Sequence, residues 1–267
     1  MKGHELSRYE AANLEIDGDR VLTYSRIACP LDCAYCFANE IIAGNANLDG
    51  THLSEEQFRL LEQLPPDIKT IRVGCDTEFL HDKDQALEAL SRLVGAGKDI
   101  SVITKFPLDD DYICELSAIS DELESNGNKL MFSVSLTCTS SKRKWEPKAP
   151  RVARRIETVR KAYSAGINTA VVIRPLIPNI DPSELDEIVD ATKDYVTGYY
   201  SGPLYLKELG EDTITAEEVA YLGCIVSEEV EDIHWMPMGN KFLKIESPQL
   251  MEYLRRKVEQ SGKTLFQ

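Results

Sequence analysis

The segment Ala28-Cys29-Pro30-Leu31-Asp32-Cys33-Ala34-Tyr35-Cys36-Phe37-Ala38 places three cysteines on one short stretch, four and then three residues apart. It directly follows a β-rich run over residues 20–27, which predicts a loop at the end of a strand. Thiolates are soft ligands that suit iron–sulfur clusters or zinc. Three thiolates can hold three irons of a cubane cluster and leave the fourth open, whereas structural zinc takes four protein ligands. The spacing therefore predicts a cluster on Cys29, Cys33 and Cys36, with zinc binding and a chance grouping as the alternatives.

The rest of the chain alternates short β-rich runs with longer amphipathic runs, a pattern typical of repeated βα units around a parallel sheet. The predicted strands cover residues 20–27, 69–74, 99–104, 129–136, 168–174 and 203–207, and the predicted helices cover about 53–63, 83–95, 110–125, 150–165 and 182–195. We therefore predict an α/β fold, a partial (β/α)6 TIM-type barrel over residues 1–240 with a C-terminal helical extension over residues 241–267. In such a barrel the reactive groups gather on the loops that follow the strands.

Two helix ends carry local signals. Ser54, with Gln57 three residues later, predicts a capping box at the start of the helix over 53–63. Gly166 can adopt the left-handed conformation and is expected to end the helix over 150–165.

The chain has 267 residues and a formal net charge of −15, and this acidic excess repels nucleic acid at long range. The charge argues against a protein that coats nucleic acid. Basic residues gather between Lys142 and Lys161, where they form either a solvated helix face or a mouth that attracts an anionic substrate. The longest apolar runs are strand-sized, so we expect no membrane span. The polar N-terminus lacks the pattern of a secretory signal, and we predict a cytoplasmic protein.

Cys29, Cys33 and Cys36, followed by Phe37, resemble the signature of the radical S-adenosylmethionine (SAM) superfamily. This resemblance implies an enzyme with a 4Fe-4S cluster on the three cysteines, an open iron that binds SAM, and Phe37 beside the cofactor. It also implies that one electron, from a donor such as flavodoxin or ferredoxin, cleaves SAM to methionine and a 5′-deoxyadenosyl radical, which removes a hydrogen atom from a substrate. The other cysteines are dispersed and form no second motif, so we predict one cluster per chain.

Motifs at later strand ends narrow this resemblance. Thr104-Lys105-Phe106 and Phe132-Ser133-Val134 are similar to the Thr-Lys and Phe-Ser segments of the branch that contains spore photoproduct lyase and DNA repair photolyase-like proteins. The resemblance implies that Lys105 meets the SAM carboxylate and that Ser133 approaches SAM. It covers roughly residues 22–180 and continues in order through Glu146-Pro147, Arg155-Ile156-Glu157, Ala165-Gly166 and Pro175-Leu176-Ile177-Pro178.

The second predicted strand ends in Gly74-Cys75-Asp76-Thr77-Glu78, where the superfamily often has a Gly-Gly-Glu-like segment. In the lyase branch a cysteine at this place returns a hydrogen atom to the product radical, which implies that role for Cys75. A small packing residue is the alternative. Thr77 matches a serine near SAM, and we expect Asp76 and Thr77 to contact the cofactor. Arg174 ends the fifth predicted strand, and we expect it to contact the cofactor as well, because its planar guanidinium is suited to pair with a carboxylate or phosphate.

The acidic composition departs from that of a duplex-repairing enzyme, which needs a surface that follows phosphates. We therefore predict a small or medium-sized anionic substrate, with a nucleotide or nucleoside as candidates and Arg151, Arg154, Arg155 and Arg174 as anion contacts. One alternative keeps the radical chemistry but makes the substrate a polymer, either damaged DNA or a peptide. A second alternative is a non-enzymatic scaffold that zinc or a cluster stabilises.

Overall fold

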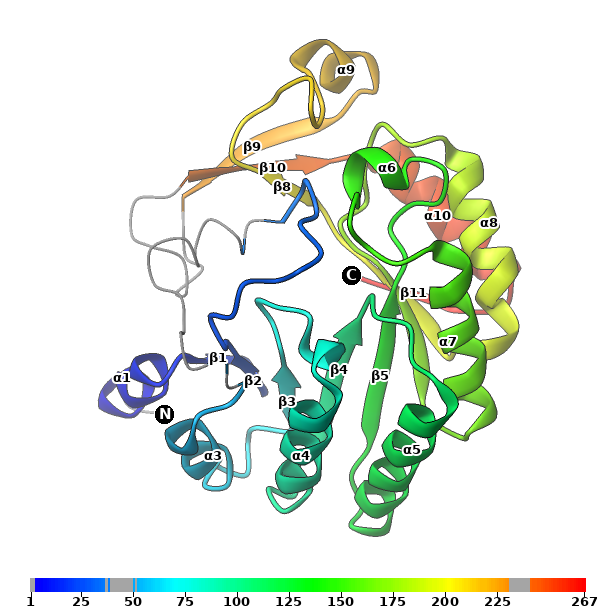
Figure 1. Cartoon of the computed structure of the whole chain (residues 1–267). Coiled ribbons are helices and arrows are strands. Elements are labelled where there is room, and N and C mark those ends of the chain that lie inside the picture. The colour runs from blue at the N-terminus through cyan, green and yellow to red at the C-terminus, as the bar shows by residue number, and fades with distance from the viewer. Residues whose placement is uncertain (1–2, 37, 39–49, 51, 231–240) are drawn as a thin grey trace.

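A computed structural model describes residues 3–36, 38, 50, 52–230 and 241–267, and its centre is a sheet of eight strands (Figure 1). The strand order is β1-β2-β3-β4-β5-β6-β7-β11. Strands β2 to β7 run parallel, β1 is antiparallel to β2, and β11 is parallel to β7. The strands are β1 (Leu14–Asp17), β2 (Arg20–Thr23), β3 (Thr70–Val73), β4 (Asp99–Thr104), β5 (Leu130–Ser135), β6 (Thr169–Ile173), β7 (Gly198–Ser201) and β11 (Thr264–Phe266).

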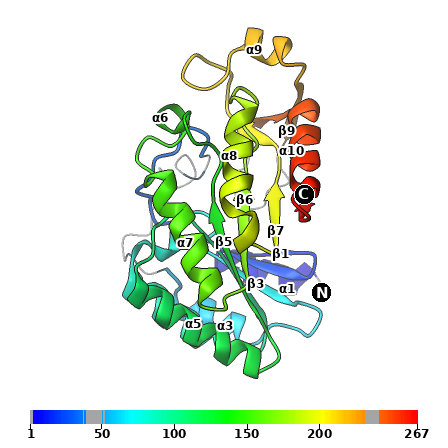
Figure 2. The ribbon, with the colours of Figure 1, turned by 90° about the vertical axis from the view of Figure 1, so that its right-hand side faces the viewer.

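Helices cover the outer face of this sheet, as Figures 1 and 2 show from two sides. The α-helices are α1 (Gly3–Ala11), α3 (Glu55–Leu61), α4 (Lys83–Val94), α5 (Asp110–Ser125), α6 (Lys142–Trp145), α7 (Val152–Ser164), α8 (Pro182–Thr192), α9 (Ala216–Tyr221) and α10 (Pro248–Gln260). Short 3-10 helices cover Phe79–His81 and Lys193–Tyr195. Parallel strands alternating with outer helices confirm the prediction of a partial α/β barrel.

The two faces of the sheet differ in chemistry because successive strand residues point to opposite sides. On the helix side, Ile71 and Val102 belong to the continuous buried apolar core. The opposite, inner side mixes the small polar residues Ser101, Ser133 and Ser135 with the apolar residues Ile103 and Met131. Hydroxyl groups therefore face the barrel interior, where they can donate hydrogen bonds to bound molecules.

A second, antiparallel sheet lies above the carboxyl ends of the parallel strands (Figure 1). Its strands are β8 (Leu204–Leu206), β10 (Lys241–Glu246) and β9 (Ile225–Val230), in that spatial order. The C-terminal extension thus contains the predicted helix, α10, with β10 before it and β11 after it. No helix in the described ranges is both long and apolar enough to cross a bilayer.

The prediction of a sixth barrel strand over residues 203–207 is wrong. The sixth parallel strand is β7, and Leu204–Leu206 belongs to the second sheet. Pro203 has no backbone N–H and cannot donate a hydrogen bond to a neighbouring strand. This makes the segment unfavourable as a central strand with a neighbour on each side. Gly198 of β7, by contrast, fits closely against β11, because a Cβ atom there would lie 2.8 Å from the Phe266 ring.

The predicted helix-end signals are confirmed. The Ser54 hydroxyl accepts a hydrogen bond from the Gln57 N–H at 3.2 Å, and the Gln57 side chain accepts one from the Ser54 N–H at 2.9 Å. Gly166 follows α7 with a φ of +83°, the left-handed conformation that ends the helix.

Candidate active site at the cysteine loop

The cysteine loop, residues 24–36, leaves the carboxyl end of β2 and passes over the ends of the neighbouring strands (Figure 1). Its first turn is fixed by the buried Asp76 carboxylate, which follows β3. This carboxylate accepts hydrogen bonds from the backbone N–H groups of Ser25, at 3.0 Å, and Arg26, at 2.7 Å. It also accepts one from the Ser25 hydroxyl at 3.2 Å. Asp76 is thus occupied in holding the loop.

The three thiols of the loop are unpaired and differ in exposure. Cys33 is buried, whereas Cys29 and Cys36 are partly exposed. Burial raises the pKa of Cys29 and raises that of Cys33 to about 11, although the nearby Lys105 cation partly opposes the shift at Cys33. Both thiols are therefore protonated at neutral pH in the free protein, and metal binding must release their protons.

Residues at the end of α6 hold the cysteine loop in place through hydrogen bonds. The Ala34 N–H donates a hydrogen bond to the Trp145 carbonyl at 2.9 Å. The Tyr35 hydroxyl, between the second and third cysteines, donates one to Glu146 at 2.5 Å. The position of the thiols is therefore tied to residues more than a hundred positions later in the chain.

Glu146 is the centre of a buried ionic network. Its Oε2 lies 2.7 Å from Nη2 of Arg155, and both side chains are 0% exposed. Its Oε1 accepts a hydrogen bond from Thr137 at 2.5 Å and lies 3.8 Å from Nζ of Lys105. Burial alone would raise the pKa of Glu146, but Lys105 and Arg155 outweigh it and hold this pKa below its ordinary value. Glu146 is thus a charged group that links the cysteine loop to Lys105.

A second buried carboxylate, Glu78, holds the backbone at Lys105. It accepts hydrogen bonds from the Thr104 hydroxyl at 2.5 Å and from the Lys105 N–H at 2.7 Å. Burial raises its pKa, although these hydrogen bonds and the Lys105 charge oppose the shift. The sequence analysis assigned no role to Glu78. Its place at the end of the Gly74–Glu78 segment could have indicated one, because the matching segment of the superfamily is Gly-Gly-Glu-like. Lys105 itself is 15% exposed, so its ammonium group still reaches the site.

Cys75 and Thr77 follow β3 at the same end of the barrel, and both are partly exposed. The Cys75 thiol lies 3.6 Å from the Arg72 carbonyl oxygen, and the backbone N–H of Cys75 donates a hydrogen bond to the Thr23 carbonyl at 3.0 Å. The turn before Cys75 requires Gly74, whose φ is +66° and whose added Cβ would lie 2.5 Å from the Phe79 side chain.

Ser133 of β5 is 6% exposed and stands on the inner side of the barrel. Ser135, two residues later on the same side, has a buried hydroxyl without a hydrogen-bond partner among the described residues. The sequence analysis did not identify Ser135, although it lies two residues after Ser133 and therefore faces the same side of the strand.

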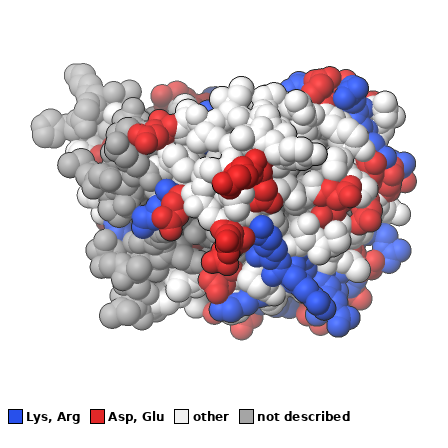
Figure 3. Space-filling model, turned by 90° about the horizontal axis from the view of Figure 1, so that it is seen from above, with Lys and Arg blue, Asp and Glu red and all other residues white. Residues whose placement is uncertain are grey.

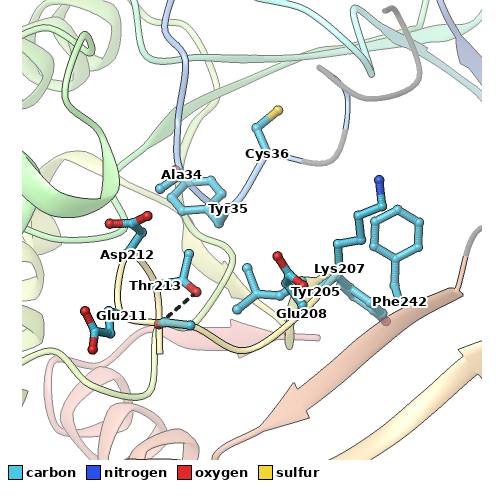
Figure 4. Close-up of a pocket in the computed structure, with 12 residues that line it drawn as sticks. Ala34, Tyr35, Cys36, Tyr205, Lys207, Glu208, Glu211, Asp212, Thr213 and Phe242 are labelled. Atoms are coloured by element: carbon cyan, nitrogen blue, oxygen red, sulfur yellow. Dashed lines mark hydrogen bonds between the residues drawn. The ribbon is translucent and has the colours of Figure 1, made fainter. Parts of the chain in front are cut away.

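A cavity of about 240 Å³ opens beside the cysteine loop (Figure 4). Figure 4 shows Tyr35 and Cys36 on one side of it and residues of the β8 region on the other. A second cavity, of about 420 Å³, is lined by Arg174 and by residues of β9, β10 and α10. Tyr205 lines both cavities.

Of the predicted site residues that the structure describes, only Cys36 lines the first cavity and only Arg174 lines the second. Phe37 lies outside the described residues. Arg155 is fully buried against Glu146, so its predicted role as an anion contact is wrong. Arg151 and Arg154 are exposed at the start of α7, in the outer helical layer. Three further cations of the basic stretch form ion pairs, Lys148 with Asp32, Arg160 with Glu157 and Lys161 with Asp110, as expected for a solvated face. Figure 3 shows basic and acidic side chains mixed on the face of the molecule seen from above.

Comparisons with solved structures support the fold. Spore photoproduct lyase complexed with dinucleoside spore photoproduct aligns with a TM-score of 0.63 and 14% identity, covering 90% of this chain and 73% of the lyase chain. Streptococcus suis SuiB bound to S-adenosylmethionine aligns with a TM-score of 0.60 and 14% identity, covering 97% of this chain and 52% of SuiB. At such identity these likenesses show the fold alone. A comparison with curated proteins found no match.

The family comparison identifies the superfamily, and the matched region contains the three cysteines of the cysteine loop. The sequence model of the radical SAM superfamily matches residues 27–192, a region that begins just before Cys29 and ends with α8. This region is more than half of the chain, and the protein belongs to the radical SAM superfamily.

Proposed function

We propose that this enzyme removes a hydrogen atom from a small or medium-sized anionic molecule, with a nucleotide or nucleoside as the favoured class. Membership of the superfamily makes the protein an enzyme that uses a 4Fe-4S cluster and SAM and needs an electron donor. The observation that carries the proposal is that the cavity beside Cys36 shares Tyr205 with the cavity that contains Arg174. Cys36, a proposed cluster ligand, and the cation Arg174 therefore line two cavities that share one wall residue.

The chemistry of the thiols fits the cluster. Cys29, Cys33 and Cys36 supply three soft ligands from one loop, and they leave one iron for SAM. In the described part of the chain, no three His, Cys, Asp or Glu side chains converge on a point that one ion could occupy. In a cluster each thiolate binds a different iron, so such convergence is not needed. We propose these cysteines as the cluster ligands and a flavodoxin or ferredoxin as the electron donor.

When bound, the cluster and SAM supply the 5′-deoxyadenosyl radical that removes the hydrogen atom. The residues of the chain orient these groups. Glu78 fixes the backbone of Lys105 and Glu146 lies near its ammonium group, so Lys105 is positioned to pair with the SAM carboxylate. We propose Ser133 and Thr77 as further SAM contacts. Asp76, whose carboxylate holds Ser25 and Arg26, acts as a positioning residue for the loop.

Substrate-dependent formation of 5′-deoxyadenosine tests the proposed substrate class. The protein is reconstituted anaerobically and incubated with SAM and dithionite, either alone or with nucleosides, nucleoside monophosphates, a dinucleoside spore photoproduct, damaged duplex DNA or a synthetic peptide. We expect stimulation and a changed product with a nucleoside or nucleotide. Stimulation by duplex DNA alone would favour the polymer alternative, to which the fold likeness to spore photoproduct lyase also points. Stimulation by a peptide alone would contradict the anionic-substrate proposal.

Cys75→Ala is expected to separate SAM cleavage from product formation. Burial raises the pKa of Cys75 to about 11, so the thiol carries its hydrogen atom at neutral pH. Transfer of that atom to a carbon-centred product radical forms a C–H bond and leaves a thiyl radical on sulfur. With a substrate found as above, we expect the variant to form 5′-deoxyadenosine while the hydrogen-quenched product falls to a minor fraction. Cys114→Ala, on the outer helix α5, is the control; equal product yields in both variants would make Cys75 a packing residue.

A further inference from the structure

Arg174 reaches the second cavity because of its place in the strand pattern. It follows β6 directly and shares the inner side of the barrel with Ala170 and Val172. Its guanidinium lies against Gly202: a Cβ atom added at Gly202 would lie 3.0 Å from Nε and 3.4 Å from Cζ of Arg174. The absence of a side chain at residue 202 therefore makes room for this guanidinium.

The remaining walls of the cavity are mostly apolar. Leu176, Tyr205, Ile225 and Met251 contribute to them. The other basic side chain in the lining, Lys244, forms an ion pair with Glu246 at 3.8 Å. The cavity thus offers a cation beside apolar and aromatic surface, a combination that suits a molecule with an anionic group and a flat apolar body.

Arg174 differs from the other cation of this cavity in having no acidic partner. Its side chain is exposed, and across the described ranges it lies within ion-pair distance of no carboxylate. Glu246, which also lines the cavity, is paired with Lys244. The Arg174 guanidinium is therefore the cation that is open to an anionic ligand.

A guanidinium presents a planar fork of N–H donors that matches the oxygens of a phosphate. We propose that Arg174, seated on Gly202, binds a phosphate group of the substrate. The inference rests on the proposed function, because it identifies the second cavity as the substrate cavity.

Direct binding measurements test this site without turnover. The cluster-reconstituted protein is titrated anaerobically with inorganic phosphate and with thymidine 5′-monophosphate, and binding is followed by calorimetry and phosphorus NMR. Thymidine, which lacks the phosphate, is the paired ligand. We expect the monophosphate to bind at least about 10-fold more tightly than thymidine, as loss of one charge-assisted contact implies.

The variants are Arg174→Gln and Gly202→Ala, with Arg59→Gln as the control, since Arg59 is an exposed residue of α3 that pairs with Glu56. We expect Arg174→Gln to weaken binding of the monophosphate by about 10-fold or more, since a charged hydrogen-bonded contact is removed. Gly202→Ala should weaken it less, because the added methyl group displaces the guanidinium without removing it. Arg59→Gln should bind as the wild type does. Circular dichroism spectra confirm that each variant is folded.

Three results would overturn this site. They are absence of monophosphate binding to the wild type, equal binding by Arg174→Gln and wild type, and displacement of the monophosphate by SAM, which would place Arg174 in the cofactor site. Reductive SAM cleavage by the wild type is measured separately. Its absence would refute the proposed function, whereas the titration would still report on Arg174, because binding requires no radical chemistry.

Discussion

Cys36→Ala is expected to abolish cluster binding and SAM cleavage together. Cys36 lies on the cavity side of the cysteine loop, and its loss leaves two thiols where three are needed to hold the cubane. Changes in residues that merely support a metal ligand cost about 10-fold to 100-fold in affinity or activity, so loss of a direct ligand should exceed 100-fold. Iron and sulfide content, the visible absorption spectrum and the rate of 5′-deoxyadenosine formation check this expectation.

Cys114→Ala is the matched control for this variant. Cys114 is an exposed cysteine on α5, in the outer helical layer. It should retain the iron content and SAM cleavage of the wild type. If Cys36→Ala also retained both, Cys36 would not be a ligand and the three-cysteine assignment would fail.

Arg155→Met is expected to destabilise the folded protein strongly. Arg155 and Glu146 are both 0% exposed, and the substitution leaves the Glu146 carboxylate buried with only the more distant Lys105 as a cationic neighbour. Removing one partner of a buried ion pair costs about 3 to 5 kcal/mol in the free energy of unfolding. Because Glu146 also binds Tyr35, we expect the cysteine loop to loosen and the yield of reconstituted cluster to fall. Urea unfolding of the reduced, metal-free protein measures the change in stability.

Arg160→Met provides the comparison within the same helix. Arg160 forms an exposed pair with Glu157 at 2.7 Å, and exposed pairs contribute little to stability. Its unfolding midpoint should stay close to that of the wild type. A loss below about 1 kcal/mol for Arg155→Met would mean that the buried pair behaves as a surface pair, contrary to the expected desolvation of Glu146.

The sequence predicted elements well where local signals were complete. Strand β4 and helix α5 have the predicted bounds, residues 99–104 and 110–125. In β4 polar and apolar residues alternate from Asp99 to Val102, and the Asp109 side chain caps α5 by accepting a hydrogen bond from the Tyr112 N–H at 2.8 Å. The sixth strand was misplaced because β7 and β8 are both short and tyrosine-containing. Pairing of β7 with β6 and β11, which no local pattern reveals, decided between them.

In the candidate site, too, some residues could be predicted from the sequence and others could not. The cysteine loop and the strand-end positions of Cys75, Lys105 and Ser133 could be identified along the chain. The supporting carboxylates could not, because Glu146 meets Tyr35 across 111 residues and Glu78 meets Lys105 across 27. Buried ionic contacts between distant segments produce no recognisable residue spacing in the sequence. The pairing of Arg155 with Glu146 could therefore not be predicted, and the prediction that Arg155 contacts an anion is wrong.

Anaerobic reconstitution with iron and sulfide, followed by addition of SAM and dithionite, tests the central claim most directly. We predict about four irons per chain, held by Cys29, Cys33 and Cys36, and formation of 5′-deoxyadenosine and methionine. A preparation that takes up only zinc and forms no 5′-deoxyadenosine under reduction would contradict the claim and establish a zinc-stabilised scaffold in its place. About eight irons per chain would contradict the prediction of a single cluster.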